Sequence, residues 1–106
     1  MYAALRWYNV EPGMAEEMAR RVRDGFVPLI SSAPGYKGYY LIESSNAVVI
    51  TVGIFEHKAA AEQSHRLAAD WVARNLGGVI LGPPTLSAGE VLVEHIPDQH
   101  IHDTTG

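Results

Sequence analysis

The segment at residues 33–43, APGYKGYYLIE, is the sequence feature that most constrains the fold. Pro34 and Gly35 end a helical pattern, because proline cannot continue a helix and glycine is common just after its last residue. The tyrosine-rich residues that follow predict a strand, and residues 47–55 predict another after a polar turn at residues 44–46. A helix, a stop and a hairpin form half of a split β-α-β module.

Hydrophobic periodicity predicts one helix on each side of this hairpin. Residues 14–29 carry apolar side chains at helical spacing, and Gly25 and Pro28 predict a kink or a restart near residues 25–27. The buried stripe expected for this helix is Met14, Met18, Val22, Phe26 and Leu29. The second helix is predicted at residues 57–76, before a glycine pair. Its expected inner stripe is Ala60, Ser64, Leu67, Ala68, Trp71 and Val72.

Two further strands complete the order of elements. Residues 2–10 predict a first strand with Ala4, Arg6 and Tyr8 on one face, and residues 87–95 predict a fourth strand. The order β-α-β-β-α-β is typical of a ferredoxin-like α+β sandwich, with two helices on one face of a four-stranded antiparallel sheet. We expect one domain at residues 1–96, followed by a polar C-terminal tail at residues 97–106.

The strand at residues 47–55 has a near-continuous apolar run, which is typical of burial on both faces. The two helices of this architecture cover only one face of the sheet. We therefore expect a second copy of the chain to cover the other face, which makes the protein a homodimer through the sheet face.

The composition excludes several classes of site and partner. The net charge is −4 and no basic stripe with interleaved aromatic residues occurs, so we expect no nucleic-acid partner. The absence of cysteine excludes disulfides, cysteine-ligated metals and a thiol nucleophile. His95, His100 and His102 do not have the spacing of a rigid metal site, so none is predicted. No apolar run reaches about 18 residues and no leader pattern occurs, so we expect no membrane segment and a cytoplasmic location.

The strands carry four candidate site residues. Arg6 and Tyr8 would fix an anionic or enolic substrate if their face looks toward the helices, and they would be dimer contacts if it looks away. Tyr36 and Tyr40 are predicted to share a face around Gly38, leaving room for a flat aromatic ligand. Packing within the sheet is the alternative for both tyrosines.

The second helix carries three more candidates. His65 is its central titratable group, and an imidazole beside a pocket can act as a general base; a position at the rim is the alternative. Ser64 would contact a substrate or bond back to the carbonyl of residue 60. Trp71 would be either a core side chain or an aromatic wall for the ligand.

Four segments resemble the antibiotic biosynthesis monooxygenase domain: residues 33–36, 47–56, 58–62 and 81–84. The resemblance covers about residues 2–95 and implies a dimeric α+β barrel. It also implies a cofactor-independent monooxygenase, or a related small-molecule enzyme, that acts on an aromatic or polyketide-like substrate. For this activity we expect His65 as the base and Arg6 as the stabiliser of the substrate anion. The expected substrate-binding residues are Tyr8, Tyr36, Tyr40, Ser64 and Trp71.

The chain departs from the residue patterns of two activities of this fold. Cofactor-free members that form quinones carry Asn and Trp on the third strand and Tyr early in the second helix. The chain has Ile50, Ile54 and Ala60 there, or Thr51, Phe55 and Ala61 in the other register. Members that degrade haem carry a histidine ten residues after the helical Trp, whereas Leu81 follows Trp71 at that spacing. A non-catalytic dimeric binding or accessory protein, and a haem-binding protein that uses another histidine, are the alternative functions.

Overall fold

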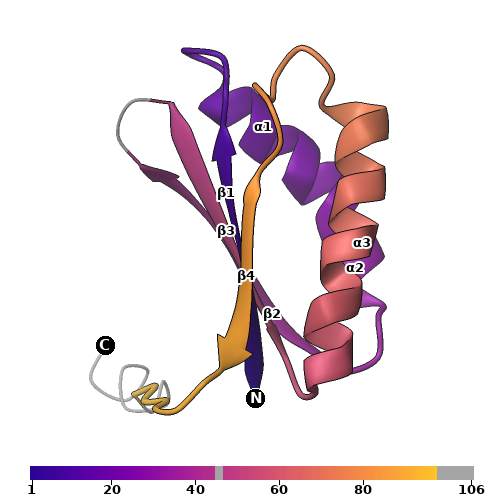
Figure 1. The fold of residues 1–106 in the computed structure, drawn as a ribbon, viewed down its shortest axis with the longest axis vertical. Coiled ribbons are helices and arrows are strands. Elements are labelled where there is room, and N and C mark those ends of the chain that lie inside the picture. Colours follow the sequence, from indigo (N-terminus) through magenta and orange to yellow (C-terminus); the bar gives the residue numbers. More distant parts are fainter. Residues whose placement is uncertain (45–46, 98–106) are drawn as a thin grey trace, which may run out of the picture.

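All helices of the protein lie on one face of a single sheet, as Figure 1 shows. The computed structural model describes residues 1–44 and 47–97. The elements are β1 (Tyr2–Asn9), α1 (Ala15–Arg21), a π-helical turn η1 (Val22–Phe26), α2 (Val27–Ser31), β2 (Tyr36–Ser44), β3 (Val48–Phe55), α3 (Lys58–Asn75) and β4 (Thr85–Glu90). This order confirms the predicted ferredoxin-like α+β fold. The predicted turn at residues 44–46 and the tail from residue 98 fall mainly outside the described residues.

The sheet has the order β2-β3-β1-β4, and every neighbouring pair of strands is antiparallel. The predicted limits of the fourth strand, residues 87–95, are wrong, because β4 begins at Thr85 and ends at Glu90. The strand ends where Glu90 pairs with Tyr2, the first residue of β1, and one further bond follows, from the Val91 N–H group to the Met1 carbonyl. β1 therefore lies between β3 and β4, in the interior of the sheet.

The side chains of β1 alternate, and one set points into the core beneath the helices. Ala4, Arg6 and Tyr8 belong to this set and are at most 3% exposed. On β3, Thr51 pairs with Arg6 and Val49 pairs with Tyr8, and both partners are also buried. The sequence does not decide toward which face of the sheet Arg6 and Tyr8 point. The structure places both side chains on the face that meets the helices.

One turn of π-helix, η1, separates α1 from α2. It lies where Gly25 and Pro28 predict an interruption, and it adds one residue to the helical period. The buried stripe therefore shifts by one position in the next turn. Ile30 is 1% exposed, whereas Leu29, which the regular period predicts to be buried, is 43% exposed.

A β-bulge in β2 changes which tyrosines face the core. The pairing of β2 with β3 shifts between Tyr36 and Gly38, so Lys37 is an extra residue. Tyr36 and Tyr39 consequently face the helices together, whereas Tyr40 faces away and is 63% exposed. The prediction that Tyr36 and Tyr40 share a face is wrong, because strict alternation does not account for a bulge.

The face of the sheet opposite the helices carries apolar side chains that the fold leaves half-buried or exposed. These are Leu5, Trp7, Tyr40, Ile42, Ile50, Val52 and Ile54. Along β3 the burial alternates residue by residue, so a single copy of the chain buries only one face of this strand. The predicted burial of both faces therefore depends on a partner.

Candidate functional site

Arg6 places a cation inside the core, between the sheet and the helices. The side chain is 2% exposed, and its guanidinium carbon lies 5.9 Å from the centre of the Phe26 ring. None of the ion pairs among the described residues includes Arg6. A buried charge without an opposite partner is strongly destabilising. Within the described part of the chain, Arg6 is therefore a buried cation without a carboxylate partner, and it contacts the His65 imidazole and the Phe26 ring instead.

His65 of α3 links this guanidinium to the edge of the sheet. Its Nδ1 lies 3.2 Å from Nη1 of Arg6, and its Nε2 lies 3.2 Å from the Ser87 carbonyl oxygen on β4. A guanidinium only donates and a carbonyl only accepts, so these partners assign the proton to Nε2 and the lone pair to Nδ1. Burial, and then the Arg6 charge, hold the pKa of His65 below its ordinary value of 6.5. His65 is therefore a neutral imidazole at pH 7, with its basic nitrogen next to the cation.

Two phenols near Arg6 remain protonated at neutral pH. Burial raises the pKa of Tyr8 above its ordinary value of 10.0, although the positive charge of Arg6 opposes this shift. Burial also raises the pKa of Tyr39, again against the effect of Arg6. Each phenol can therefore donate a hydrogen bond to an acceptor that reaches it.

An outer pocket of about 320 Å³ opens beside Arg6, Tyr8 and His65. The rest of its wall is apolar and comes from α3, β4 and the segment before β4. These residues are Ala69, Val72, Ala73, Pro83, Pro84 and Leu86. Ligand sites in proteins usually have this composition, a mainly apolar wall with a few polar groups at fixed positions.

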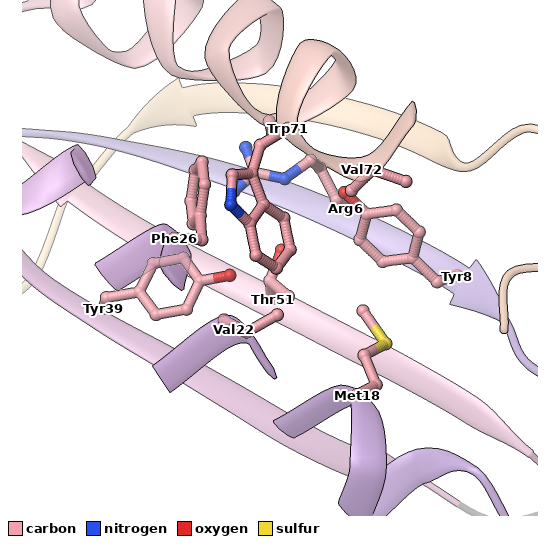
Figure 2. Close-up of a pocket in the computed structure, with 10 residues that line it drawn as sticks. Arg6, Tyr8, Met18, Val22, Phe26, Tyr39, Thr51, Trp71 and Val72 are labelled. Atoms are coloured by element: carbon pink, nitrogen blue, oxygen red, sulfur yellow. The ribbon is translucent and has the colours of Figure 1, made fainter. Parts of the chain in front are cut away.

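A much smaller inner cavity of about 10 Å³ lies between the sheet and the helices, and Figure 2 shows its lining. Its wall consists of Arg6, Tyr8, Met18, Val22, Phe26, Tyr39, Thr51, Ala68, Trp71 and Val72. Arg6, Tyr8 and Val72 thus border both spaces. The Nε atom of Arg6 and Oγ1 of Thr51 are buried without a hydrogen-bond partner among the described residues.

The structure brings four of the seven predicted site residues to these two spaces. Arg6, Tyr8 and His65 meet at the outer pocket, and Trp71 borders the inner cavity, where its ring centre lies 5.7 Å from that of Phe26. These contacts agree with the predicted positions but do not test the predicted roles.

The other three predicted residues lie elsewhere. Ser64 is fully buried, and its hydroxyl donates to the Ala61 carbonyl at 2.6 Å, one residue from the acceptor expected for back-bonding. Tyr36 packs edge to face on Phe55, with ring centres 6.2 Å apart, and borders neither space. Tyr40 lies on the opposite face of the sheet. The geometry therefore gives these three side chains no place at the outer pocket.

Sequence reasoning misses most of the apolar lining, and three of the missed residues are informative: Thr51, Tyr39 and Leu86. Thr51 gave a usable signal, because it is a hydroxyl residue inside an otherwise apolar strand that was predicted to be buried. Tyr39 is missed because the bulge reverses the alternation of side chains along β2, which the sequence pattern does not reveal. Leu86 is hidden because β4 begins before the predicted residue 87.

The described residues contain no group of three potential His, Asp or Glu metal ligands. None of their helices is long and apolar enough to cross a membrane. His57 borders a second apolar groove of about 380 Å³ with Ala33, Pro34, Ala59, Ala60, Gln63 and Leu67. His100 and His102 lie outside the described residues.

Comparisons with known proteins define the class of fold. No protein-family model matches the sequence, and no curated protein sequence is significantly similar to it. Among solved structures, a monooxygenase from the ActVA-Orf6 gene of Streptomyces coelicolor, in complex with nanaomycin D, matches with a TM-score of 0.72 and 16% identity. The match covers 92% of each chain.

Two other solved structures are equally similar. A protein of unknown function from Nitrosomonas europaea has a TM-score of 0.72 and 18% identity, over 92% of this chain and 94% of its own. A variant of MhuD with two manganese protoporphyrin IX molecules per active site has a TM-score of 0.71 and 17% identity, over 92% of this chain and all of its own. The chain therefore has the fold of the antibiotic biosynthesis monooxygenases, a fold that also includes a porphyrin-binding protein.

Proposed function

We propose that the protein is a cofactor-independent monooxygenase that oxidises a small phenol or enol of aromatic or polyketide-like structure. The observation that carries this proposal is the buried Arg6 guanidinium, which has no carboxylate partner and borders a pocket with an apolar wall. Such a site favours the anionic form of a flat, weakly polar molecule. The phenolate or enolate is the form that dioxygen oxidises most readily.

Arg6 and His65 form the deprotonation pair of this mechanism. A substrate hydroxyl that enters between them accepts a hydrogen bond from the Arg6 guanidinium and donates its proton to the lone pair on Nδ1 of His65. The Ser87 carbonyl fixes the tautomer with its lone pair on Nδ1. In the free protein this lone pair accepts a hydrogen bond from Arg6, so the entering hydroxyl must replace that bond. Arg6 then stabilises the oxygen anion in a site from which water is largely excluded.

The outer pocket suits an aromatic ring system in size and in wall chemistry. Its volume of about 320 Å³ is at the lower end of the usual range for small-molecule sites, roughly 300–1,000 Å³. Pro83, Pro84 and Leu86 offer flat apolar contact on one side, and Tyr8 offers a phenol donor. The nanaomycin D complex of the similar S. coelicolor monooxygenase supports this substrate class.

We also propose that the protein acts as a cytoplasmic homodimer joined through the outer sheet face. The seven apolar side chains on that face support this assembly, because monomeric proteins rarely leave so large a contiguous apolar surface in water. The face lies opposite the helices, so dimerisation would leave the outer pocket of each copy, and the opening of that pocket beside β4, uncovered.

A ligand screen followed by oxygen uptake tests the proposed function. Thermal shift against quinols, polyketide phenols, flavonoids and haem identifies the ligand class, since a ligand at 100 times its Kd stabilises the protein by about 2.7 kcal/mol. Oxygen consumption with a phenol that binds, lost in Arg6→Met, supports the monooxygenase. Binding of that phenol without oxygen consumption contradicts it and favours the non-catalytic binding protein. A Soret shift with haem alone favours the haem-binding alternative.

A further inference from the structure

The inner cavity has two different sides. The helices contribute Met18, Val22 and Ala68, whose side chains are apolar. The sheet contributes Arg6 and Thr51, which are paired across β1 and β3 and are 2% and 1% exposed. Arg6 Nε and Thr51 Oγ1 are the buried side-chain atoms left without a partner in the described part of the chain. An apolar wall thus lies across from a pair of free polar groups.

The size of the cavity restricts its occupant to one very small molecule. About 10 Å³ is close to the smallest space that admits a single water molecule. No aromatic substrate fits without a large movement of the helices. Dioxygen has nearly the cross-section of water but is longer, so the side chains that line the cavity must shift slightly to admit it. As a neutral apolar molecule it suits the helix side of the cavity.

We propose that the inner cavity is the binding site for dioxygen, and that Arg6 and Thr51 stabilise the charge that dioxygen acquires on reduction. This inference rests on the proposed function, because the electron comes from the substrate anion in the outer pocket. The phenolate loses one electron and becomes a phenoxyl radical, while dioxygen gains it and becomes superoxide. One negative charge therefore moves from the outer pocket to the inner cavity, and the net charge of the complex does not change.

The position of Arg6 fits this transfer, because its side chain borders both spaces. The guanidinium contacts the substrate anion before the step and superoxide after it, so the cation does not have to move. Hydrogen-bond donors that are already oriented toward the developing charge lower the activation barrier, because the site does not have to reorganise during the step. Tyr39, whose phenol stays protonated, also borders the cavity and adds a donor.

The site is tested first without substrate, by methyl NMR of the whole protein under dioxygen and under argon. Paramagnetic dioxygen should increase relaxation most at the methyl groups of Thr51, Ala68 and Val72. The buried methyls of Ile30 and Val79, which do not line the cavity, are the reference. Ala68→Val should remove the effect by filling the cavity, and Val22→Ile is the second filling variant if the first does not fold. Equal enhancement at all buried methyls overturns the proposal and indicates a cavity that admits only water.

The role of Thr51 is tested by turnover at varied dioxygen concentration. Thr51→Val keeps the shape of the side chain and removes the hydroxyl, so kcat/KM for dioxygen should fall roughly 10- to 100-fold, as expected for one hydrogen bond to a charged group. The Kd of the phenol should not change, and Thr51→Ser should restore the rate. An unchanged kcat/KM in Thr51→Val overturns the role of Thr51. Local NMR enhancement in a protein that oxidises no phenol leaves the dioxygen site standing and rejects the proposed function instead.

Discussion

The Nη1 atom of Arg6 lies 3.2 Å from Nδ1 of His65, so a permanent cation and the lone pair of a neutral imidazole face each other inside the fold. An ordinary arginine–histidine contact at a surface would be weak and mobile. This one is anchored on both sides, because Arg6 is buried in β1 and His65 is also bonded to the Ser87 carbonyl on β4. The pair therefore offers a donor and an acceptor at fixed positions to one incoming hydroxyl.

Arg6→Met should stabilise the protein while it removes activity. Replacing buried charge by an apolar side chain of similar length is often neutral, or stabilising by about 1–4 kcal/mol. A gain of 1 kcal/mol corresponds to a rise in Tm of roughly 4–8 °C in a domain of this size. Differential scanning calorimetry measures the change, and Arg23→Met, at an exposed position, is the control. A loss of stability in Arg6→Met would mean that the guanidinium is mainly a structural group.

His65 should titrate below pH 6.5 in the folded protein. Its folded-state pKa is lowered, so the unfolded chain binds the proton more readily and the contribution of His65 to stability is complete above about pH 6.5. That contribution is lost as the pH falls through the folded-state pKa. NMR of the imidazole protons follows the titration directly. His65→Gln should flatten the pH dependence of Tm below pH 6.5. A His65 pKa above 6.5 would contradict the assigned contacts.

Gly25→Ala should destabilise the protein by about 1–3 kcal/mol, the usual cost of overpacking a core. A β-carbon at residue 25 would lie 2.9 Å from Cζ2 of Trp71, which lines the inner cavity. Gly38→Ala is the matched control, because a β-carbon there meets nothing within 4 Å. Urea unfolding of both variants gives the comparison. Equal stability of the two would show that Trp71 can move away from η1 at little cost.

Val52→Asp should convert the proposed homodimer into a monomer. Val52 lies on the outer sheet face, where it pairs with Tyr40 of β2 and Leu5 of β1, and a carboxylate there would be buried by a second copy. Light scattering after size exclusion reports the mass. Glu43→Gln, near the end of β2, is the control that should remain dimeric. A wild-type protein that is already monomeric at high concentration would reject the proposed interface.

The overall fold follows from sequence because its signals are local and redundant. Pro34 and Gly35 end a helix, the hairpin follows directly, and each helix has a clear apolar period. The face of β1 could not be assigned in this way. Leu5 and Trp7 are more apolar than Arg6 and Tyr8, yet Arg6 and Tyr8 are the side chains buried against the helices. Only the packing of the helices decides between the two faces.

Two backbone irregularities, the π-helical turn and the β-bulge, account for the wrongly assigned faces of α2 and β2. The π-helical turn moves burial from Leu29 to Ile30, and the bulge at Lys37 exchanges Tyr40 for Tyr39. Each irregularity inserts one residue into a period, which reassigns every later side chain of the element. Periodicity does not encode such insertions, because their cost is balanced by tertiary contacts elsewhere in the fold.

The most direct test of the account is the absorption spectrum of a phenol bound to the protein without oxygen. Because Arg6 favours the anion and His65 accepts the proton, the phenolate band should appear at a pH below the pKa of the free phenol. The band should be absent in Arg6→Met and restored in part by Arg6→Lys. A phenol that binds the wild-type protein with the spectrum of its neutral form, or that is ionised equally in Arg6→Met, would contradict the central role of Arg6.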